Sequence, residues 1–260
     1  MKPAPGGPPR AQRPSVAAGR GLLRSPFGSS RATWITILGG FVALGACLLA
    51  LGSLAEDVRD REVNALDTLA TPFLHGLASP ALDWLMNAAT FMGSNLFIPP
   101  VFIVLVACLV RLHRSREALF IATASGGSLV LNEAMKFVFN RPRPQLPWAQ
   151  VLPDPSFPSG HTMNSVVFYV AFAVVLWSVR GRRTGVAALV IGIALSLVIG
   201  VSRIYLGYHY FTDVAAGLLA GTAWLAVVAA AFGAGPLSRR WRDGDLTGST
   251  EPEEQPVVVR

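Results

Sequence analysis

The sequence predicts an all-α membrane protein, a six-transmembrane helix bundle with an amphipathic interfacial segment between spans 1 and 2. Of the 260 residues, 52% are hydrophobic and only 14% are charged, and the mean hydropathy is +0.48. Long apolar stretches recur along the chain, and about 20 apolar residues in a helix cross a hydrocarbon core of about 30 Å. Composition and stretch length together exclude an ordinary soluble protein.

The first element is a polar segment, residues 1–31, whose Pro, Gly, Ser and Arg content predicts a disordered cytoplasmic tail. Span 1 is expected at residues 34–54, which are 21 residues without a charge. A cleaved signal sequence is the alternative, because Ser53 and Ala55 have the spacing of a cleavage site. The apolar stretch is longer than a signal core, which favours an uncleaved anchor.

The segment between spans 1 and 2 has a different pattern. In residues 56–79, apolar side chains recur every three or four positions among charges, as on an amphipathic helix that lies on a membrane surface. Residues 81–92 are expected to form a second short helix. Span 2 follows at about residues 96–110, and its start is left open because Pro99 and Pro100 lie inside it.

The remaining spans have clearer limits. We expect spans 3 to 6 at residues 118–139, 162–179, 184–201 and 214–235. Span 6 contains Gly217-x3-Gly221, a spacing of small residues that lets helices pack closely. The membrane domain is therefore assigned to residues 32–237, and the polar residues 238–260 to a second disordered cytoplasmic tail.

The distribution of Lys and Arg predicts the orientation of the spans. Sixteen of these 22 residues lie in the two tails and in the loops at residues 111–116 and 180–183, and six lie in the alternate loops. Because cytoplasmic segments carry the excess of positive charge, both termini are expected in the cytoplasm of a multi-pass cell-membrane protein. The ends of spans 3 and 5 and the starts of spans 4 and 6 then face the extracytoplasmic side.

Three polar stretches lie at these extracytoplasmic ends. Ionisable groups beside hydrocarbon are costly and usually face a partner, a cavity or a substrate. Together the stretches offer three cations, two histidines and a carboxylate, and such cations at an apolar boundary suit the phosphate group of a lipid. The residues concerned are Lys136, Arg143, Ser159, Gly160, His161, Arg203, His209 and Asp213.

The third stretch offers a nucleophile. His209 and Asp213 are four residues apart, which on a helix places both on one face, so the carboxylate can hold one imidazole nitrogen and leave the other free. His209 would attack phosphorus, and Asp213 would orient its ring and stabilise the cation that forms. His161 would protonate the departing oxygen and then activate water to hydrolyse the phosphohistidine.

The other residues would bind the phosphate. Arg143 and Arg203 can each form forked hydrogen bonds to phosphate oxygens, and Lys136 adds a point charge. Ser159 and Gly160 precede span 4, so their backbone N–H groups and the helix dipole can point at a phosphate, with glycine allowing a close approach.

The motifs Lys136-x6-Arg143-Pro144, Pro158-Ser159-Gly160-His161 and Ser202-Arg203-x5-His209-x3-Asp213 resemble the three-part signature of the type 2 phosphatidic acid phosphatase superfamily. The resemblance covers residues from about 80 to 235. It implies a metal-independent phosphatase with a six-span helical core, no metal and no cofactor, and the residue roles given above. Soluble vanadium haloperoxidases share this signature, but six spans argue against that branch.

Several alternatives accompany this prediction. The expected substrate is a lipid phosphate or diphosphate, with polyprenyl diphosphate first, then phosphatidic acid and phosphatidylglycerol phosphate. A non-hydrolytic lipid-phosphate binding module or a phosphotransferase on the same fold is the alternative function. A metal site built from His161, His209 and Asp213 is the chemical rival, which the neighbouring cations disfavour. Membrane lipids are expected partners and nucleic acid is not, and the sequence predicts no oligomeric state.

Other polar and aromatic residues near the motifs have open roles. Arg141 is expected either to contact the phosphate or headgroup or to be an exposed loop charge. Glu133 is expected either to pair with Lys136 or to cap a polar cluster. His75 is expected at the surface. Trp148 and Phe157 are each expected either to touch lipid or to anchor at the membrane interface.

Overall fold

The computed structural model describes residues 31–60, 65–150 and 152–232, with side chains from residue 44 onward. These residues form helices without any strand. Residues 1–40 form one unit of the chain and residues 41–260 another, and the description below concerns the second unit. Both predicted tails lie outside the described residues, apart from Arg31. The helices are α1 (Arg31–Arg59), α2 (Ala65–His75), α3 (Pro80–Met92), α4 (Ile98–Arg111), α5 (Ser115–Phe139), α6 (Gly160–Arg180), α7 (Arg182–Tyr205) and α8 (Phe211–Ala231).

Four of the described helices are long and apolar enough to cross a membrane, namely α5, α6, α7 and α8. They match the predicted spans 3 to 6 in position, although each begins two or three residues earlier than expected, α7 ends four residues later and α8 ends four residues earlier. The protein is therefore a multi-pass membrane protein. At the position of predicted span 2, α4 is apolar but has only 14 residues. It begins with two prolines in its first turn, where a missing N–H breaks no helical hydrogen bond. The count of six spans stays a prediction.

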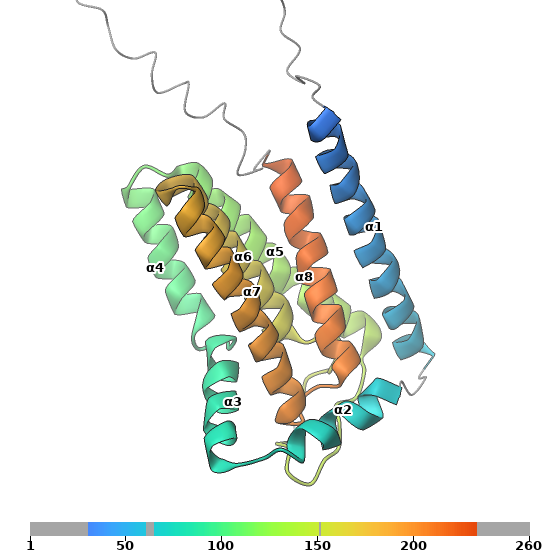
Figure 1. The fold of residues 1–260 in the computed structure, drawn as a ribbon. Helices are drawn as coiled ribbons and strands as arrows, with labels where there is room; N and C mark the ends of the chain where they lie inside the picture. The colour runs from blue at the N-terminus through green and yellow to red at the C-terminus, as the bar shows by residue number, and fades with distance from the viewer. Residues whose placement is uncertain (1–30, 61–64, 151, 233–260) are drawn as a thin grey trace, which may run out of the picture. The chain divides into compact units, whose positions relative to one another are not determined.

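The core of this unit forms around α6, which packs against α5, α7 and α8. Figure 1 shows α4 to α8 running side by side. In the most apolar 18-residue stretch of α6, 50% is buried, compared with 28% in α7. Helix α7 therefore exposes much more of its surface to the surroundings. Large apolar side chains of α5 and α6, including Phe120, Ile121, Val167 and Phe168, fill the space between the helices.

The predicted close approach at Gly217 and Gly221 is confirmed. A Cβ atom on Gly217 would come within 2.8 Å of the Ser159 carbonyl oxygen, and one on Gly221 within 2.6 Å of a Val166 methyl group. Both distances are too short for a real Cβ contact, so only glycine lets α8 lie this close to α6. Ser159 is the residue before α6, so this contact sets the distance between the starts of α6 and α8.

The two short helices α2 and α3 differ in part from expectation. The predicted helical pattern at residues 56–79 divides into the end of α1 and a separate α2, while α3 matches the predicted short helix. In Figure 1, α2 runs across the end where α7 finishes and α8 begins, and it packs against both. Its inner side carries the buried Asp67 and Thr71, whereas Leu69 and Phe73 are exposed. Its position at a membrane surface stays a prediction.

Candidate active site

The site is built from helix ends and the loops that join them. Lys136 lies in the last turn of α5, Arg143 in the following loop, and Arg203 in the last turn of α7. Charges of Lys136, Arg143 and Arg203 all act on the His161 imidazole near the start of α6. The structure therefore brings the predicted motifs to one end of α5 to α8. The residues it brings together are Lys136, Arg143, Ser159, Gly160, His161, Arg203, His209 and Asp213.

The pairing of His209 with Asp213 is present, but the helix predicted to create it is not. His209 lies in the loop between α7 and α8, and Asp213 lies in the first turn of α8. The two side chains meet because Asp213 Oδ2 accepts the Tyr210 N–H at 2.9 Å, which folds the loop back over the helix start. His209 Nδ1 is then 3.5 Å from Asp213 Oδ2.

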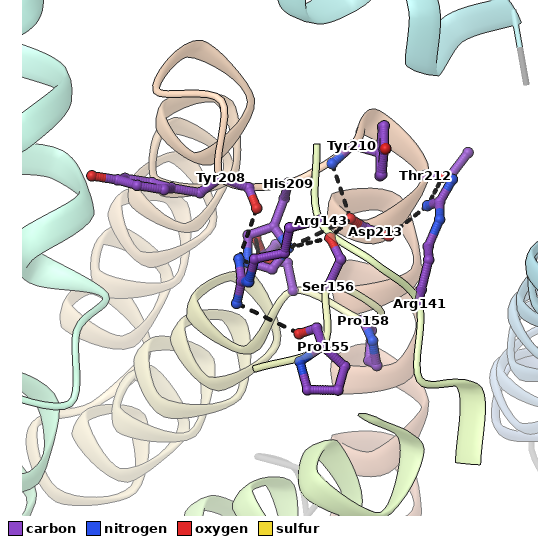
Figure 2. A network of polar contacts seen from close by, with 12 residues as sticks. Arg141, Arg143, Pro155, Ser156, Pro158, Tyr208, His209, Tyr210, Thr212 and Asp213 are labelled. Carbon is purple, nitrogen blue, oxygen red and sulfur yellow. Dashed lines mark hydrogen bonds and ion pairs between the residues drawn. The ribbon is translucent and has the colours of Figure 1, made fainter. Parts of the chain in front are cut away.

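Ser156 lies between these two residues, as Figure 2 shows. It was not predicted as a site residue. Its hydroxyl donates to Asp213 Oδ2, because a carboxylate can only accept, and its Oγ is 3.3 Å from His209 Nδ1. With the hydroxyl proton turned toward Asp213, an oxygen lone pair is left for His209, so Nδ1 carries the imidazole proton. The Nε2 atom then keeps its lone pair.

Arg143 binds several groups at once and connects two motif loops. Its Nη1 donates to the Tyr208 carbonyl at 2.7 Å and lies 3.2 Å from His209 Nε2. Its Nε donates to the backbone oxygen of Asp154 at 2.8 Å. The guanidinium therefore fixes the residue before His209 and, with Nδ1 carrying the imidazole proton, donates a hydrogen bond to the lone pair of Nε2.

Asp154, which was not predicted, forms ion pairs with two of the cations. Its Oδ2 accepts a hydrogen bond from the Lys136 ammonium and lies 2.9 Å from Arg143 Nη2. Burial alone would raise the pKa of Asp154, but the Lys136 hydrogen bond and the Arg143 charge outweigh it and lower the pKa to about 2. The predicted pairing of Lys136 with Glu133 is wrong, because Lys136 turns toward the loop while Glu133 is exposed.

Arg203 is buried, with 4% of its surface exposed. Its Nη1 donates to Thr90 Oγ1 at 2.8 Å, and its guanidinium carbon lies 4.2 Å from the centroid of the Tyr208 ring. The buried Nε has no hydrogen-bond partner among the described residues. A buried N–H without an acceptor is costly, so this donor is available for an anionic ligand.

The start of α6 is arranged differently from the prediction. Ser159 is the residue before the helix and Gly160 is its first residue. The Ser159 N–H donates to the Asp213 carbonyl at 3.0 Å, so it is already used inside the protein. A Cβ atom on Gly160 would come within 2.8 Å of Asn132 Oδ1, so the close approach is to that side chain. The first-turn N–H groups of Gly160 and His161 have no acceptor within the helix.

The expectation that Arg141 is an exposed loop charge is wrong, and its guanidinium is directed at protein groups. It is half-buried, and its guanidinium donates to Asp213 Oδ1 at 2.6 Å, to Asp67 Oδ2 at 2.7 Å and to Thr212 Oγ1 at 2.8 Å. Burial lowers the pKa of Arg141, but the charges and hydrogen bonds of Asp213 and Asp67 raise it above its ordinary value. Asp67 comes from α2, more than seventy residues earlier in the chain, and no sequence pattern connected it with the site.

The electrostatics favour a neutral His209. Burial lowers the pKa of His209 to about 4, although the hydrogen bond and charge of Asp213 act in the opposite direction. The His209 imidazole is thus neutral at neutral pH, with one proton on the ring. Among the described residues, no group of three or more His, Cys, Asp or Glu side chains could hold a metal ion, so the rival arrangement of His161, His209 and Asp213 is not formed.

Two aromatic expectations also need correction. Phe157 is fully buried and packs edge-on against Phe139, with ring centroids 5.0 Å apart, so it contacts neither lipid nor the interface. His75 is half-buried and stacks on Trp148, with ring centroids 4.2 Å apart, which ties α2 to the loop after α5.

Comparison with known proteins agrees with this arrangement. Three bacterial proteins are similar in sequence. Phosphatidylglycerophosphatase B of Bacillus subtilis (strain 168) is 26% identical over 171 residues, 65% of this chain and 84% of that protein. YbjG of Escherichia coli (strain K12) is 31% identical over 144 residues, 53% of this chain and 69% of that protein. Undecaprenyl-diphosphatase BcrC of Bacillus subtilis (strain 168) is 29% identical over 154 residues, 56% of this chain and 74% of that protein.

The fold also matches a solved structure. It is similar to the crystal structure of a transmembrane PAP2 type phosphatidylglycerolphosphate phosphatase from Bacillus subtilis, with a TM-score of 0.67 and 24% identity. The match covers 75% of this chain and 98% of that one. Residues 117–235, which contain all three motifs, match the PAP2 superfamily. The chain therefore belongs to the PAP2 superfamily, the type 2 phosphatidic acid phosphatases, which are metal-independent membrane lipid phosphatases.

Proposed function

We propose that this protein hydrolyses a lipid phosphate or diphosphate through a phosphohistidine formed on His209. The observation that carries this proposal is the geometry of His209: Ser156 and Asp213 engage Nδ1, while the Nε2 lone pair accepts a hydrogen bond from Arg143 Nη1 at 3.2 Å. A nucleophile needs a lone pair directed at groups that bind the electrophile, and Arg143 can transfer this hydrogen bond to a phosphate oxygen when the substrate binds. A site for phosphate binding alone would need the cations and no such imidazole.

In the first step, the lone pair on His209 Nε2 forms a bond to phosphorus as the bond from phosphorus to the leaving oxygen breaks. His161, protonated when the negative charge of the bound substrate phosphate offsets the neighbouring cations, donates its proton to that oxygen, so the alcohol or lipid phosphate leaves. The positive charge that develops on His209 is stabilised by Asp213 through Nδ1.

In the second step, water attacks phosphorus and the bond from Nε2 to phosphorus breaks. His161, now neutral, accepts a proton from this water and becomes the acid for the next cycle. Inorganic phosphate leaves, and His209 regains its lone pair. Each step conserves atoms and charge without a metal or a cofactor.

The cations would stabilise the charge on the transferred group. Arg143 contacts His209 Nε2, Lys136 shares the Asp154 carboxylate with Arg143, and the charge of Arg203 acts on the same imidazole. The unpaired Arg203 Nε supplies a buried donor. The first-turn N–H groups of Gly160 and His161 at the start of α6 add to this, whereas the predicted Ser159 N–H is already bonded to the Asp213 carbonyl. Loss of one well-placed donor typically costs roughly 10²- to 10³-fold in rate.

Two separate observations support the proposed substrate and the proposed side of the membrane. The names of the similar proteins include a phosphatidylglycerophosphatase and an undecaprenyl-diphosphatase. The excess of Lys and Arg in the tails and alternate loops favours an extracytoplasmic site. An outward-facing site suits a polyprenyl diphosphate that is released during envelope synthesis, so we put this substrate first, ahead of phosphatidic acid and phosphatidylglycerol phosphate.

The test uses the purified full-length chain in detergent, with and without EDTA. Phosphate release is measured from a polyprenyl diphosphate, phosphatidic acid and phosphatidylglycerol phosphate for the wild type, His209→Ala and Ser196→Ala. Ser196 is a buried serine of α7 that donates within its own helix, so it serves as the control. We expect EDTA-resistant release by the wild type and control, and none by His209→Ala.

A second measurement detects the intermediate. Rapid quenching with ³²P-labelled substrate should leave acid-labile, base-stable label on the wild type and none on His209→Ala. Full activity of His209→Ala would overturn the proposal. Binding of the lipid phosphates by the wild type without any phosphate release would instead support a binding module.

A further inference from the structure

One cation at the site does not face the proposed phosphate position. Arg141 lies between two carboxylates on different helices: its Nη1 is 2.6 Å from Asp213 Oδ1 and its Nη2 is 2.7 Å from Asp67 Oδ2. Both carboxylates are buried, with 0% of Asp213 and 5% of Asp67 exposed. In Figure 2, Arg141 approaches Asp213 and Thr212 from the side away from His209.

Asp67 also holds the first turn of α8 directly. Its Oδ1 accepts the Thr212 N–H at 2.8 Å, and its Oδ2 accepts the Thr212 hydroxyl at 2.7 Å. Thr212 is the residue before Asp213, so the carboxylate on α2 fixes the backbone that carries the proposed catalytic carboxylate. An anion at a helix N-terminus is also favoured by the helix dipole and by the unpaired N–H groups there.

We infer that Asp67 and Arg141 are positioning residues, which orient Asp213 and set how much of its negative charge reaches His209. This inference rests on the proposed role of His209 as nucleophile. Arg141 contacts neither His209 nor the face of its ring that carries Nε2, so it acts through Asp213. The packing of α2 against the start of α8 therefore also positions Asp213.

The charge balance gives predictions of opposite sign. Arg141 shares one positive charge between two carboxylates, so removing Asp67 leaves that charge on Asp213 alone and weakens the support that Asp213 gives to the His209 imidazolium. Removing Arg141 leaves Asp213 unshielded and strengthens that support. The pKa of His209 should therefore fall in Asp67→Asn and rise in Arg141→Gln.

Other charged groups near these residues stay the same in both variants. His209 is also faced by Arg143, Arg203 and His161. The Tyr210 hydroxyl lies near Arg141, whose guanidinium carbon is 4.2 Å from the centroid of the Tyr210 ring. Burial raises the pKa of Tyr210, so this hydroxyl is neutral across the acid range and does not affect the comparison.

The experiment compares pH profiles of kcat/KM for the purified full-length wild type, Asp67→Asn, Arg141→Gln and the double variant, with one lipid phosphate in detergent. The acid limb should move up by about one pH unit in Arg141→Gln and down by less in Asp67→Asn. The double variant removes one charge of each sign, so its limb should return toward that of the wild type. KM should change little in all variants, since none of these residues contacts the phosphate.

A matched control distinguishes loss of the Thr212 hydrogen bonds from loss of the Asp67 or Arg141 charge. Thr212→Val removes the hydroxyl contacts to Asp67 and Arg141 without changing charge, so kcat can fall but the acid limb should not move. Limbs that stay in place, or that move in the same direction in Asp67→Asn and Arg141→Gln, would overturn the inference. If Arg141→Gln does not fold, the downward shift in Asp67→Asn alone decides the question.

Failure of the inference can be told from failure of the proposed function. Loss of phosphatase activity in His209→Ala together with unmoved limbs would reject the positioning role and leave the phosphohistidine mechanism intact. Full activity in His209→Ala would reject both. Arg141→Lys adds a rescue test, because it keeps the charge and should keep the wild-type limb.

Discussion

Asp154 Oδ2 lies 2.9 Å from Arg143 Nη2 and also accepts a hydrogen bond from Lys136, so one carboxylate occupies two of the cations proposed to bind phosphate. A substrate phosphate and this carboxylate carry charge of the same sign and cannot both bind these cations closely. Asp154 lies in a loop and its side chain is 45% exposed, so it can turn away when the substrate enters. Asp154 therefore competes with a substrate phosphate for Lys136 and Arg143.

This competition predicts the effect of Asp154→Asn. Removing the internal charge should lower both the KM for a lipid phosphate and the inhibition constant of vanadate. The change should be up to roughly fivefold, since a partly exposed ion pair is worth about 1 kcal/mol or less. Asp60→Asn, which removes an exposed carboxylate at the end of α1, is the control for net charge. Higher values of both constants in Asp154→Asn would show that Asp154 organises the cations and does not compete.

Ser156 should affect the chemical step more than binding. In Ser156→Ala, Asp213 and His209 lose the hydroxyl between them, and His209 Nδ1 is left with a carboxylate 3.5 Å away. We expect kcat to fall about tenfold, in keeping with about 1–3 kcal/mol for a buried polar group left without its partner. Steady-state kinetics should show an unchanged KM, and Ser196→Ala should match the wild type. An unchanged kcat would show that the Ser156 hydroxyl does not support His209 in the chemical step.

The pH dependence of the reaction should report His209. Its pKa is lowered from 6.5 to about 4, so the imidazole is neutral above that range and becomes protonated as pH falls through it. Only the neutral form can attack phosphorus, so kcat/KM, corrected for ionisation of the substrate, should fall about tenfold per unit as pH drops below about 4. A separate decline toward higher pH should report loss of the proton that His161 donates. An acid limb that begins near the ordinary value of 6.5 would contradict the buried environment of His209.

Much of the site could be predicted because its residues lie in short, local motifs. The positions of Lys136, Arg143 and His161 at the ends of apolar stretches place them at one membrane boundary whatever the detailed packing. The pairing of His209 with Asp213 was predicted for the wrong reason, since a helix was assumed where a loop is folded back by the Tyr210 N–H. Sequence spacing constrained proximity but not the backbone that produces it.

The groups that surround the motifs could not be predicted, because their partners are far apart in the chain. Asp67 reaches Thr212 across 145 residues, and no periodic pattern encodes such a contact. The role of Arg141 was ambiguous because the local sequence around an arginine near a phosphate motif is the same whether the side chain faces the ligand or a buried carboxylate. Asp154 and Ser156 occupy a Pro-rich loop, where local preferences do not fix which side chains turn inward.

Gly217 offers a test of how helix packing supports the site. A Cβ atom there would lie 2.8 Å from the Ser159 carbonyl, so Gly217→Ala must push α8 away from the start of α6. Overpacking of this kind typically costs about 1–3 kcal/mol. Because the Ser159 N–H bonds to the Asp213 carbonyl, the same movement should disturb Asp213 and lower kcat.

A matched glycine in another helix provides the control. In α5, a Cβ atom on Gly126 would meet nothing within 4 Å, so Gly126→Ala should leave kcat unchanged and raise stability by up to roughly 1 kcal/mol through the better helix propensity of alanine. Thermal unfolding in detergent, followed together with phosphate release, measures both effects. If the two variants unfold at the same temperature, the close contact of α8 with α6 is not what holds the two catalytic loops together.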